Sequence, residues 1–235
     1  MKLVDAVPSA CADQLRAGEV EIALIPVIEY QRISSGAIVP DVCVGSKEKV
    51  RSVVLVTRAS DLRSLRTIAL DESSRTSATL LKIIFREFLN LEPEWRSRSP
   101  DINQMLDEND GALIIGDPAM TFRREGLNVF DLSSLWRQHT GLGFVFAMWM
   151  ARDDVTQAAR GIDFGGARDE GVSKIEEIID FYEPLLNLER VELREYLYEN
   201  ISFLPDKEMR EGMELYFELA FKHGLIPELK PLVYV

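Results

Sequence analysis

Ile68-Ala-Leu-Asp-Glu-Ser-Ser-Arg-Thr-Ser77 is the stretch that decides the fold, because a short apolar strand ends there in a cluster of hydroxyl groups. The apolar residues of the next stretch, 78–91, recur at the spacing of an amphipathic helix. A strand that runs straight into a helix is typical of α/β folds. The first turn of such a helix has unpaired N–H groups and a positive dipole, so it attracts carboxylates and phosphates.

The turn between this strand and helix is rich in hydrogen-bond donors. One Ser or Thr is enough to cap a helix, and capping by Ser74 or Thr76 is the plain structural alternative. Here four hydroxyls and one guanidinium occur within five positions, which favours a turn that binds an anionic ligand. These candidate ligand-binding side chains belong to Ser73, Ser74, Arg75, Thr76 and Ser77.

Three other roles stay open at this point. Arg75 either contacts the ligand directly or pairs with Asp71 or Asp117 and holds the turn in shape. Glu29 is a candidate general base if it faces a cleft, and is otherwise an exposed structural carboxylate. His139, in an expected loop, is either a ligand contact or an ordinary surface side chain.

Strand and helix patterns alternate through the first 150 residues, which predicts α/β architecture with mainly parallel strands. A helix is expected at Pro8–Ala17, ended by Gly18. Later, the stretch 173–176 has the pattern of a capping box that opens a helix, and the glycine-rich stretch 160–171 is expected to be a loop. Strands are expected at Ile22–Pro26, Val53–Thr57, 67–70, 112–115 and 144–149, and further helices at 191–198 and 206–223.

Composition narrows the class of protein. The chain has 235 residues, of which 46% are hydrophobic and 28% charged, as in ordinary globular proteins. Its net charge of −12 argues against nucleic acid and anionic membranes as partners, so any anion site must be locally positive. The only cysteines are Cys11 and Cys43, which gives no zinc spacing; two buried thiols are favoured over a disulfide.

Targeting signals and nucleotide-binding motifs are not found in the sequence. Residues 1–5 lack the apolar region of a secretory signal, and the longest apolar run, 144–151, is too short to span a bilayer. A soluble, cytoplasmic protein is therefore expected. Neither a G-x-G-x-x-G, a Walker A nor a G-x-S-x-G motif occurs, so local motifs alone name no chemistry.

Several segments, taken in order, resemble one family. They are 18–26 with Glu29, 50–52, 70–77, 113–117 with Ala119, 131–132, Trp136 and 140–149. This series resembles the chorismate dehydratases of the futalosine route to menaquinone, over nearly the whole chain. The Ser-Arg-Thr-Ser turn and the block Thr-Gly-Leu-x-Phe-Val-Phe-Ala-x-Trp are its specific parts, whereas the Gly-Asp step alone is weak.

The resemblance implies a two-lobed α/β fold of the periplasmic-binding-protein type (type II), with a cleft between the lobes and a helical C-terminal part. Residues 1–58 and 142–235 would form lobe I, and residues 59–141 lobe II. The chain would cross between the lobes near 54–60 and near 140–146.

The resemblance also implies a reaction, the loss of water from chorismate to give 3-[(1-carboxyvinyl)oxy]benzoate. The small-molecule substrate, chorismate, carries carboxylates that suit the hydroxyl-rich turn, and aromatisation drives the elimination, so no metal or organic cofactor is expected. By resemblance, Ser52 is the candidate catalytic residue, near the proton transfer or the leaving hydroxyl; its alternative is an ordinary strand-end serine. The implied substrate-binding residues are Ser74, Arg75, Thr76, Ser77, Thr140 and Gly141. The oligomeric state is left open.

Two departures from the family pattern matter. Family members begin with a strand and a Tyr-Leu-Asn-x-x-Pro-like turn, whose asparagine is proposed to act in catalysis, and nothing here matches it. The sequence is therefore expected to be a late start or a shortened form with weak or no activity. Gly143 stands where the family has proline, which predicts a looser crossing.

Two alternatives from other classes remain. The first is a carboxylate-binding module of the same fold that performs no chemistry, which would bind chorismate or another carboxylate and leave it unchanged. The second is the sister enzyme of the futalosine pathway, which would bind a ligand of nucleoside size. The Ser-Arg-Thr-Ser turn favours the dehydratase over this sister enzyme.

Overall fold

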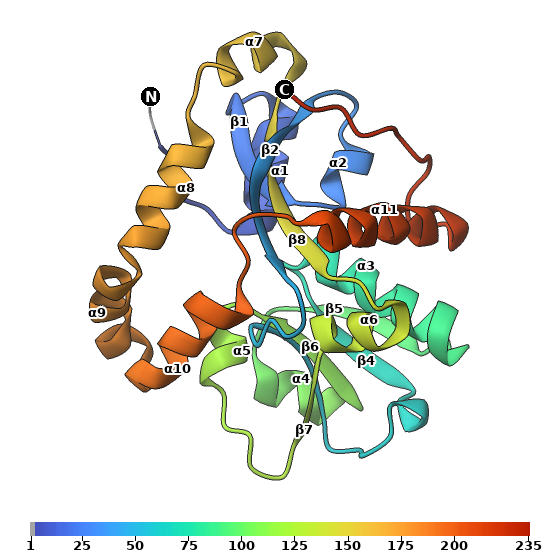
Figure 1. The fold of residues 1–235 in the computed structure, drawn as a ribbon. Helices are drawn as coiled ribbons and strands as arrows, with labels where there is room; N and C mark the ends of the chain where they lie inside the picture. Colours follow the sequence, from blue (N-terminus) through green and yellow to red (C-terminus); the bar gives the residue numbers. More distant parts are fainter. Residues whose placement is uncertain (1–2) are drawn as a thin grey trace.

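The computed structural model describes residues 3–235, which form two α/β lobes, one above the other in Figure 1. Lobe I is built on a three-stranded antiparallel sheet of order β1-β8-β2, and lobe II on a five-stranded sheet of order β5-β4-β6-β3-β7. All the strands expected from the sequence are present, and β2, β5 and β7 were not anticipated. The strands are β1 Ile22–Pro26, β2 Ala37–Ser46, β3 Val53–Thr57, β4 Thr67–Asp71, β5 Glu94–Arg98, β6 Gly111–Ile115, β7 Asn128–Asp131 and β8 Phe144–Ala151.

The expectation of mainly parallel strands was wrong. In lobe II, β4 is parallel to β5 and β6, but β3 is antiparallel to both β6 and β7. The reason is the direction in which the chain enters the lobe. It arrives from lobe I at the edge where β4 and β6 end, so Val53 at the start of β3 pairs with Ile115 at the end of β6.

The helices surround both sheets, and two expectations about them were wrong. The glycine-rich stretch is helical in α8, because Asp163 caps that helix by accepting from the Gly166 N–H. Ser173 opens no helix; its hydroxyl donates to the Glu170 carbonyl at the end of α8. The helices are α1 Pro8–Ala17, α2 Glu29–Arg32, η1 Leu62–Ser64, α3 Arg75–Ile83, η2 Ile84–Leu89, α4 Ile102–Glu108, α5 Asp117–Thr121, α6 Leu132–Thr140, η3 Asp153–Val155, α7 Thr156–Ala159, α8 Phe164–Ser173, α9 Ile175–Leu186, α10 Arg190–Glu195, η4 Tyr196–Asn200 and α11 Lys207–Lys222.

One hydrophobic core runs through both lobes. It joins buried side chains of β1 and β8 in lobe I to those of β3, α3 and α6 in lobe II. At the junction, the Phe144 ring centroid lies 5.5 Å from that of Trp136 on α6 and 5.1 Å from that of Tyr216 on α11. Burying one such side chain contributes roughly 1.5–3 kcal/mol. The two lobes are therefore held in contact along this junction.

The chain passes between the lobes at 47–52 and at 141–143. These links are neighbours, since Ser46 pairs with Phe144 where β2 and β8 meet them. The expected boundary after residue 58 does not match the sheets, because β3 lies in lobe II. We propose that lobe II begins in the link 47–52 and ends in the link 141–143.

The C-terminal helices contact both lobes rather than lobe I alone. Figure 1 shows α8, α9 and α10 along one side of the molecule, from the upper sheet to the lower one. Ile175 and Ile179 of α9 and Leu193 of α10 form a small core with Met120 of α5, which belongs to lobe II. This segment thereby joins the two lobes on that side.

Two remaining expectations concern membranes and thiols. Within residues 3–235, the structure has no helix long and apolar enough to cross a membrane. Cys11 and Cys43 are both free thiols. Cys43 is buried as expected, and burial raises the pKa of its thiol to about 12, whereas Cys11 is only partly buried.

Candidate active site

One edge of the lobe II sheet, the edge that faces lobe I, collects most of the predicted site. Ser74 follows β4, Gly116 follows β6, Ser52 precedes β3 and Asp131 ends β7. Ligands of α/β sheets bind outside the carboxyl ends of parallel strands, and β4 and β6 end at this edge. Ser52 lies two strand positions from β4, about 10 Å at the usual spacing. These groups therefore share one edge of the sheet, and this edge is the candidate site.

The Ser-Arg-Thr-Ser turn forms the start of α3, as the sequence predicted. Ser74 occupies the N-cap position of α3, all of whose residues the structure describes, but its side chain makes no capping hydrogen bond to that helix. Its Oγ atom is buried and has no hydrogen-bond partner anywhere in residues 3–235. The capping alternative is thus not realised for Ser74. A buried hydroxyl without a partner costs free energy, and a ligand oxygen at this place would remove that cost.

Thr76 and Ser77 lie at the same helix start, and lobe I contacts both the side chain and the backbone of Thr76. The Thr76 hydroxyl oxygen accepts from the Ile28 N–H at 3.4 Å, and the Thr76 carbonyl accepts from the Tyr216 hydroxyl at 3.0 Å. Only 3% of Thr76 and 4% of Ser77 are exposed. Thr76 is therefore buried at the contact between the two lobes, and Ser77 is buried beside it.

Arg75 holds the turn to lobe I, and the partners suggested by the sequence were wrong. Its guanidinium forms two hydrogen bonds with the Asp13 carboxylate, at 3.0 and 2.7 Å, and a third with Glu29 at 3.2 Å. The bond from Arg75 holds the pKa of the Asp13 carboxyl below its usual value. Asp71 instead accepts from the N–H and hydroxyl of Ser73 inside the turn.

Glu29 lies at the centre of a charged cluster between the lobes. It is 1% exposed, not the exposed carboxylate that the sequence suggested, and it pairs with Arg16, Arg32 and Arg75. With Asp13, the cluster has three positive and two negative side chains, a net charge of +1 beside the turn. The cluster thus places one net positive charge beside a turn that itself contains Asp71 and Glu72, in a chain of net charge −12. Both carboxylate oxygens of Glu29 are engaged, which argues against a role as general base.

Ser52 is held rigidly at the start of β3. Its carbonyl accepts from the Gly116 N–H at 2.8 Å, and its own N–H donates to the Val50 carbonyl at 2.7 Å. The residue before it, Arg51, has a φ of 65°, a conformation rarely adopted by a residue with a side chain. The Asp131 carboxylate supports this bend by accepting from the Val50 and Arg51 N–H groups. Strain of this kind is concentrated at functional sites.

Thr140 and Gly141 are not brought to the turn. The Thr140 hydroxyl donates to the Trp136 carbonyl at 2.8 Å, inside its own helix, and Gly141 ends α6 with a φ of 74°. Beside them, the exposed His139 stacks on Phe88, with ring centroids 4.4 Å apart. Phe88 lies eleven residues after Ser77, about 16 Å along the helix. The nine-residue helix α6 thus carries Thr140 and Gly141 away from the sheet edge.

The family model described as menaquinone biosynthesis matches residues 1–222. The chain belongs to this family. A chorismate dehydratase of Thermus thermophilus is 29% identical over 97% of this chain and 90% of its own length.

Solved structures show the fold of this family member. A protein from Archaeoglobus fulgidus superposes with a TM-score of 0.74 at 19% identity, covering 95% of this chain and 86% of its own. The periplasmic aliphatic sulphonate binding protein SsuA from Escherichia coli gives a TM-score of 0.61 at 14% identity, covering 98% and 82%. The periplasmic-binding-protein-like fold, expected from the resemblance, is confirmed.

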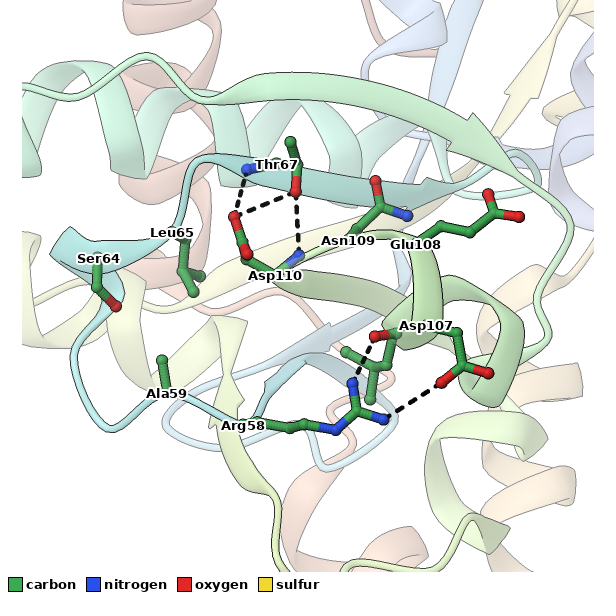
Figure 2. Close-up of a pocket in the computed structure, with 10 residues that line it drawn as sticks. Arg58, Ala59, Ser64, Leu65, Thr67, Asp107, Glu108, Asn109 and Asp110 are labelled. Carbon is green, nitrogen blue, oxygen red and sulfur yellow. Dashed lines mark hydrogen bonds and ion pairs between the residues drawn. The ribbon is translucent and has the colours of Figure 1, made fainter.

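A pocket of about 410 Å³ lies at the opposite edge of the lobe II sheet. Figure 2 shows Thr67 at the start of β4 beside Asp110, which accepts from the Thr67 N–H at 2.9 Å and the Thr67 hydroxyl at 3.1 Å. The pocket is thus at the amino end of the strand whose carboxyl end leads to Ser74. In this pocket Thr67 is bound to Asp110 and the Arg58 guanidinium to Asp107, whereas the Asn109 side-chain oxygen is buried without a partner among residues 3–235. Ligands of α/β sheets bind at the carboxyl ends of the strands, not at this end. We therefore place the candidate active site at the other edge.

Three side chains at the site were missed by sequence reasoning. Tyr196, which donates to the Ser52 hydroxyl, is 144 residues away in the sequence and has no local signal. Asp13 lies in α1 and has none either. Asp131 does have a local signal. It caps α6 by accepting from the Ser134 N–H, and an Asp directly before a helical pattern predicts a helix start. In the part of the chain that the structure describes, no three His, Cys, Asp or Glu side chains are grouped to hold a metal ion.

Proposed function

We propose that this chain is a chorismate dehydratase, a hydro-lyase that removes water from chorismate to give 3-[(1-carboxyvinyl)oxy]benzoate. The Ser74 hydroxyl at the start of α3 carries the proposal. It is buried and has no hydrogen-bond partner among residues 3–235. It lies beside the cluster of three arginines, Asp13 and Glu29, whose net charge is positive. Such a place fits a carboxylate. The relative named chorismate dehydratase, aligned over 97% of this chain, supports the choice of substrate.

The chemistry of the elimination suits these residues. Chorismate loses the proton at C3 to a base and the hydroxyl at C4, which departs as water after it takes up a proton, and the ring becomes aromatic. As the C3–H bond breaks, negative charge spreads through the ring double bonds toward the ring carboxylate. Donors fixed on that carboxylate stabilise the charge as it forms. We assign this role to Ser74, Thr76, Ser77 and the N–H groups that open α3.

Ser52 and Arg75 take different roles in this proposal. The Ser52 hydroxyl, at the start of a strand two positions from β4 along the sheet edge, would donate to the departing C4 oxygen. Arg75 acts through the turn, since Asp13 and Glu29 already occupy its guanidinium. We keep Thr140 and Gly141 out of the substrate site, because α6 separates them from the sheet edge.

The test is turnover of chorismate by the purified chain, followed by mass spectrometry of the enolpyruvyl benzoate. We expect this product to form slowly, because the sequence has no counterpart of the family's Tyr-Leu-Asn-x-x-Pro-like turn, and its formation to require Ser52. Chorismate that binds and is recovered unchanged would replace the proposal with a binding module of the same fold. No binding of chorismate, together with binding of a nucleoside-sized ligand, would favour the sister enzyme.

Replacing Ser74 by alanine should weaken chorismate binding and leave the fold as stable as before. The variant removes a hydroxyl that has no partner in residues 3–235, so no protein hydrogen bond is lost. A hydrogen bond to a charged ligand contributes about 1.5–3 kcal/mol, so the dissociation constant should rise about tenfold or more. Calorimetric titration with chorismate and thermal unfolding of the ligand-free variant measure the two effects.

Ser73→Ala is the matched control, one position earlier in the same turn. The Ser73 hydroxyl donates to Asp71 at 2.6 Å, so its loss should lower the melting temperature slightly and leave affinity unchanged. If the Ser74 variant bound chorismate as tightly as the unaltered chain, the helix start would not be the carboxylate site.

A further inference from the structure

The hydroxyl of Tyr196 reaches Ser52 from the C-terminal helices. It donates to the Ser52 hydroxyl oxygen at 3.0 Å. Tyr196 opens η4, a short π-helical turn that continues α10, and its aromatic ring packs against the buried side chains of the main core and of the small core around α9. Single π-helical turns inside helices occur frequently at functional sites.

The same helix also holds the residue before Ser52. Arg51 pairs with Glu192 and Glu195 of α10, and only 10% of the Arg51 side chain is exposed. Two consecutive residues of the bend, Arg51 and Ser52, are thus bound by one face of α10 and η4. Because Arg51 has a φ of 65°, the bend needs such support from outside to persist.

We propose that Tyr196 is a positioning residue for Ser52, fixing the direction in which the Ser52 hydroxyl donates its proton. A serine hydroxyl has one proton to donate and can accept two hydrogen bonds. When the Tyr196 hydroxyl donates to the Ser52 oxygen, the Ser52 proton must point elsewhere, so it remains available to a ligand oxygen. A hydroxyl that accepts one hydrogen bond also becomes a stronger donor of another.

This inference rests on the proposed function, because it concerns the departing oxygen of chorismate. The hydrogen bond from Ser52 to this oxygen strengthens as the C4–O bond breaks, so it acts in the transition state more than in the bound substrate. Losing Tyr196 should therefore lower kcat and leave KM nearly unchanged. A purely structural tyrosine would instead change the stability of the fold, or both kinetic parameters together.

The experiment is a double-mutant cycle with chorismate as substrate, using Tyr196→Phe, Ser52→Ala and both together. We expect Tyr196→Phe to lower kcat about tenfold and Ser52→Ala on the order of 100-fold. The double variant should match Ser52→Ala alone, since Tyr196 acts only through Ser52. Tyr198→Phe is the control, because its exposed hydroxyl contacts Glu176 and it should leave both parameters unchanged.

The outcomes separate the two proposals. No turnover by the unaltered chain would overturn the proposed function and this inference together. Turnover with an unchanged kcat in Tyr196→Phe would overturn the inference alone. A further fall in kcat when Tyr196→Phe is added to Ser52→Ala would also overturn it, because Tyr196 would then act independently of Ser52. Thermal unfolding of each variant confirms that the folded proteins are being compared.

Discussion

Replacing Glu29 by glutamine should lower the free energy of unfolding by about 3 kcal/mol. The side chain is 1% exposed and is paired with three arginines that come from α1, α2 and α3. Glutamine keeps the size but removes the charge, and it turns an amide N–H group toward guanidinium donors. Removing one partner of a buried pair costs about 3–5 kcal/mol; because the arginines are 26–45% exposed, water screens part of that cost.

Urea unfolding of the two chains measures this difference. Asp13→Asn is the matched control, since Asp13 pairs with two of the same arginines but its side chain is 52% exposed. It should cost less than about 1 kcal/mol, as exposed ion pairs do. Equal losses from the two variants would show that burial of Glu29 adds nothing. The loss should be accompanied by weaker binding of chorismate, because Glu29 holds Arg75 and with it the turn.

The elements that the sequence predicted correctly are those with local signals. The helix Pro8–Ala17 has a proline in its first turn and Gly18 after it, with a φ of 76°. The strands β3, β6 and β8 are apolar runs that are buried on both faces, so their composition alone marks them. Where the residues that determine an element lie within a few positions of one another, the sequence alone predicted that element.

The missed strands lack such signals. Strand β2 contains Pro40 and has Asp41 at a φ of 61°, and its pairing with β8 is shifted between Ile38 and Cys43. Strand β5, from Glu94 to Arg98, is largely charged and lies at the sheet edge. Only pairing with neighbouring strands makes these segments extended, and pairing is not visible in one sequence.

The site residues follow the same rule: those with a local sequence signal were predicted, and those that depend on residues distant in the sequence were not. The hydroxyl cluster after β4 was readable because its members are consecutive, and the anion-binding geometry of a helix start is a local property. The partners of Arg75 and Ser52 were not, since Asp13 is 62 residues from Arg75 and Tyr196 is 144 residues from Ser52. Thr140 and Gly141 were placed by resemblance, and the path of α6 could not be inferred from it.

The link at 141–143 also differs from its expectation, because Gly143 is not loosely packed. A Cβ atom on Gly143 would lie 2.7 Å from the Met209 Cγ atom of α11, and the Gly143 carbonyl accepts from the Trp136 indole N–H at 3.2 Å. On the other side of the contact, a Cβ atom on Gly212 would lie 2.1 Å from that carbonyl oxygen. The helix α11 thus rests directly on the backbone that joins the lobes.

Replacing Gly212 by alanine should therefore destabilise the protein by about 3 kcal/mol, even though alanine favours helices by about 1 kcal/mol over glycine. The new methyl group would meet a backbone oxygen, which cannot rotate away as a side chain can. Gly171→Ala in α8 is the control, because the space around that position is open among residues 3–235. It should stabilise by about 0.5–1 kcal/mol, the opposite sign for the same chemical change.

Chemical unfolding of both variants, beside the unaltered chain, measures the two changes. A Gly212 variant as stable as the unaltered chain would mean that α11 does not lie against the link. If the expected loss of stability is found, the substitution should also affect the candidate active site. Tyr216, one turn further along α11, donates to the Thr76 carbonyl at the start of α3. A displaced α11 should therefore weaken chorismate binding in proportion to the loss of stability, although the atoms nearest a Cβ atom on Gly212 belong to Leu142 and Gly143.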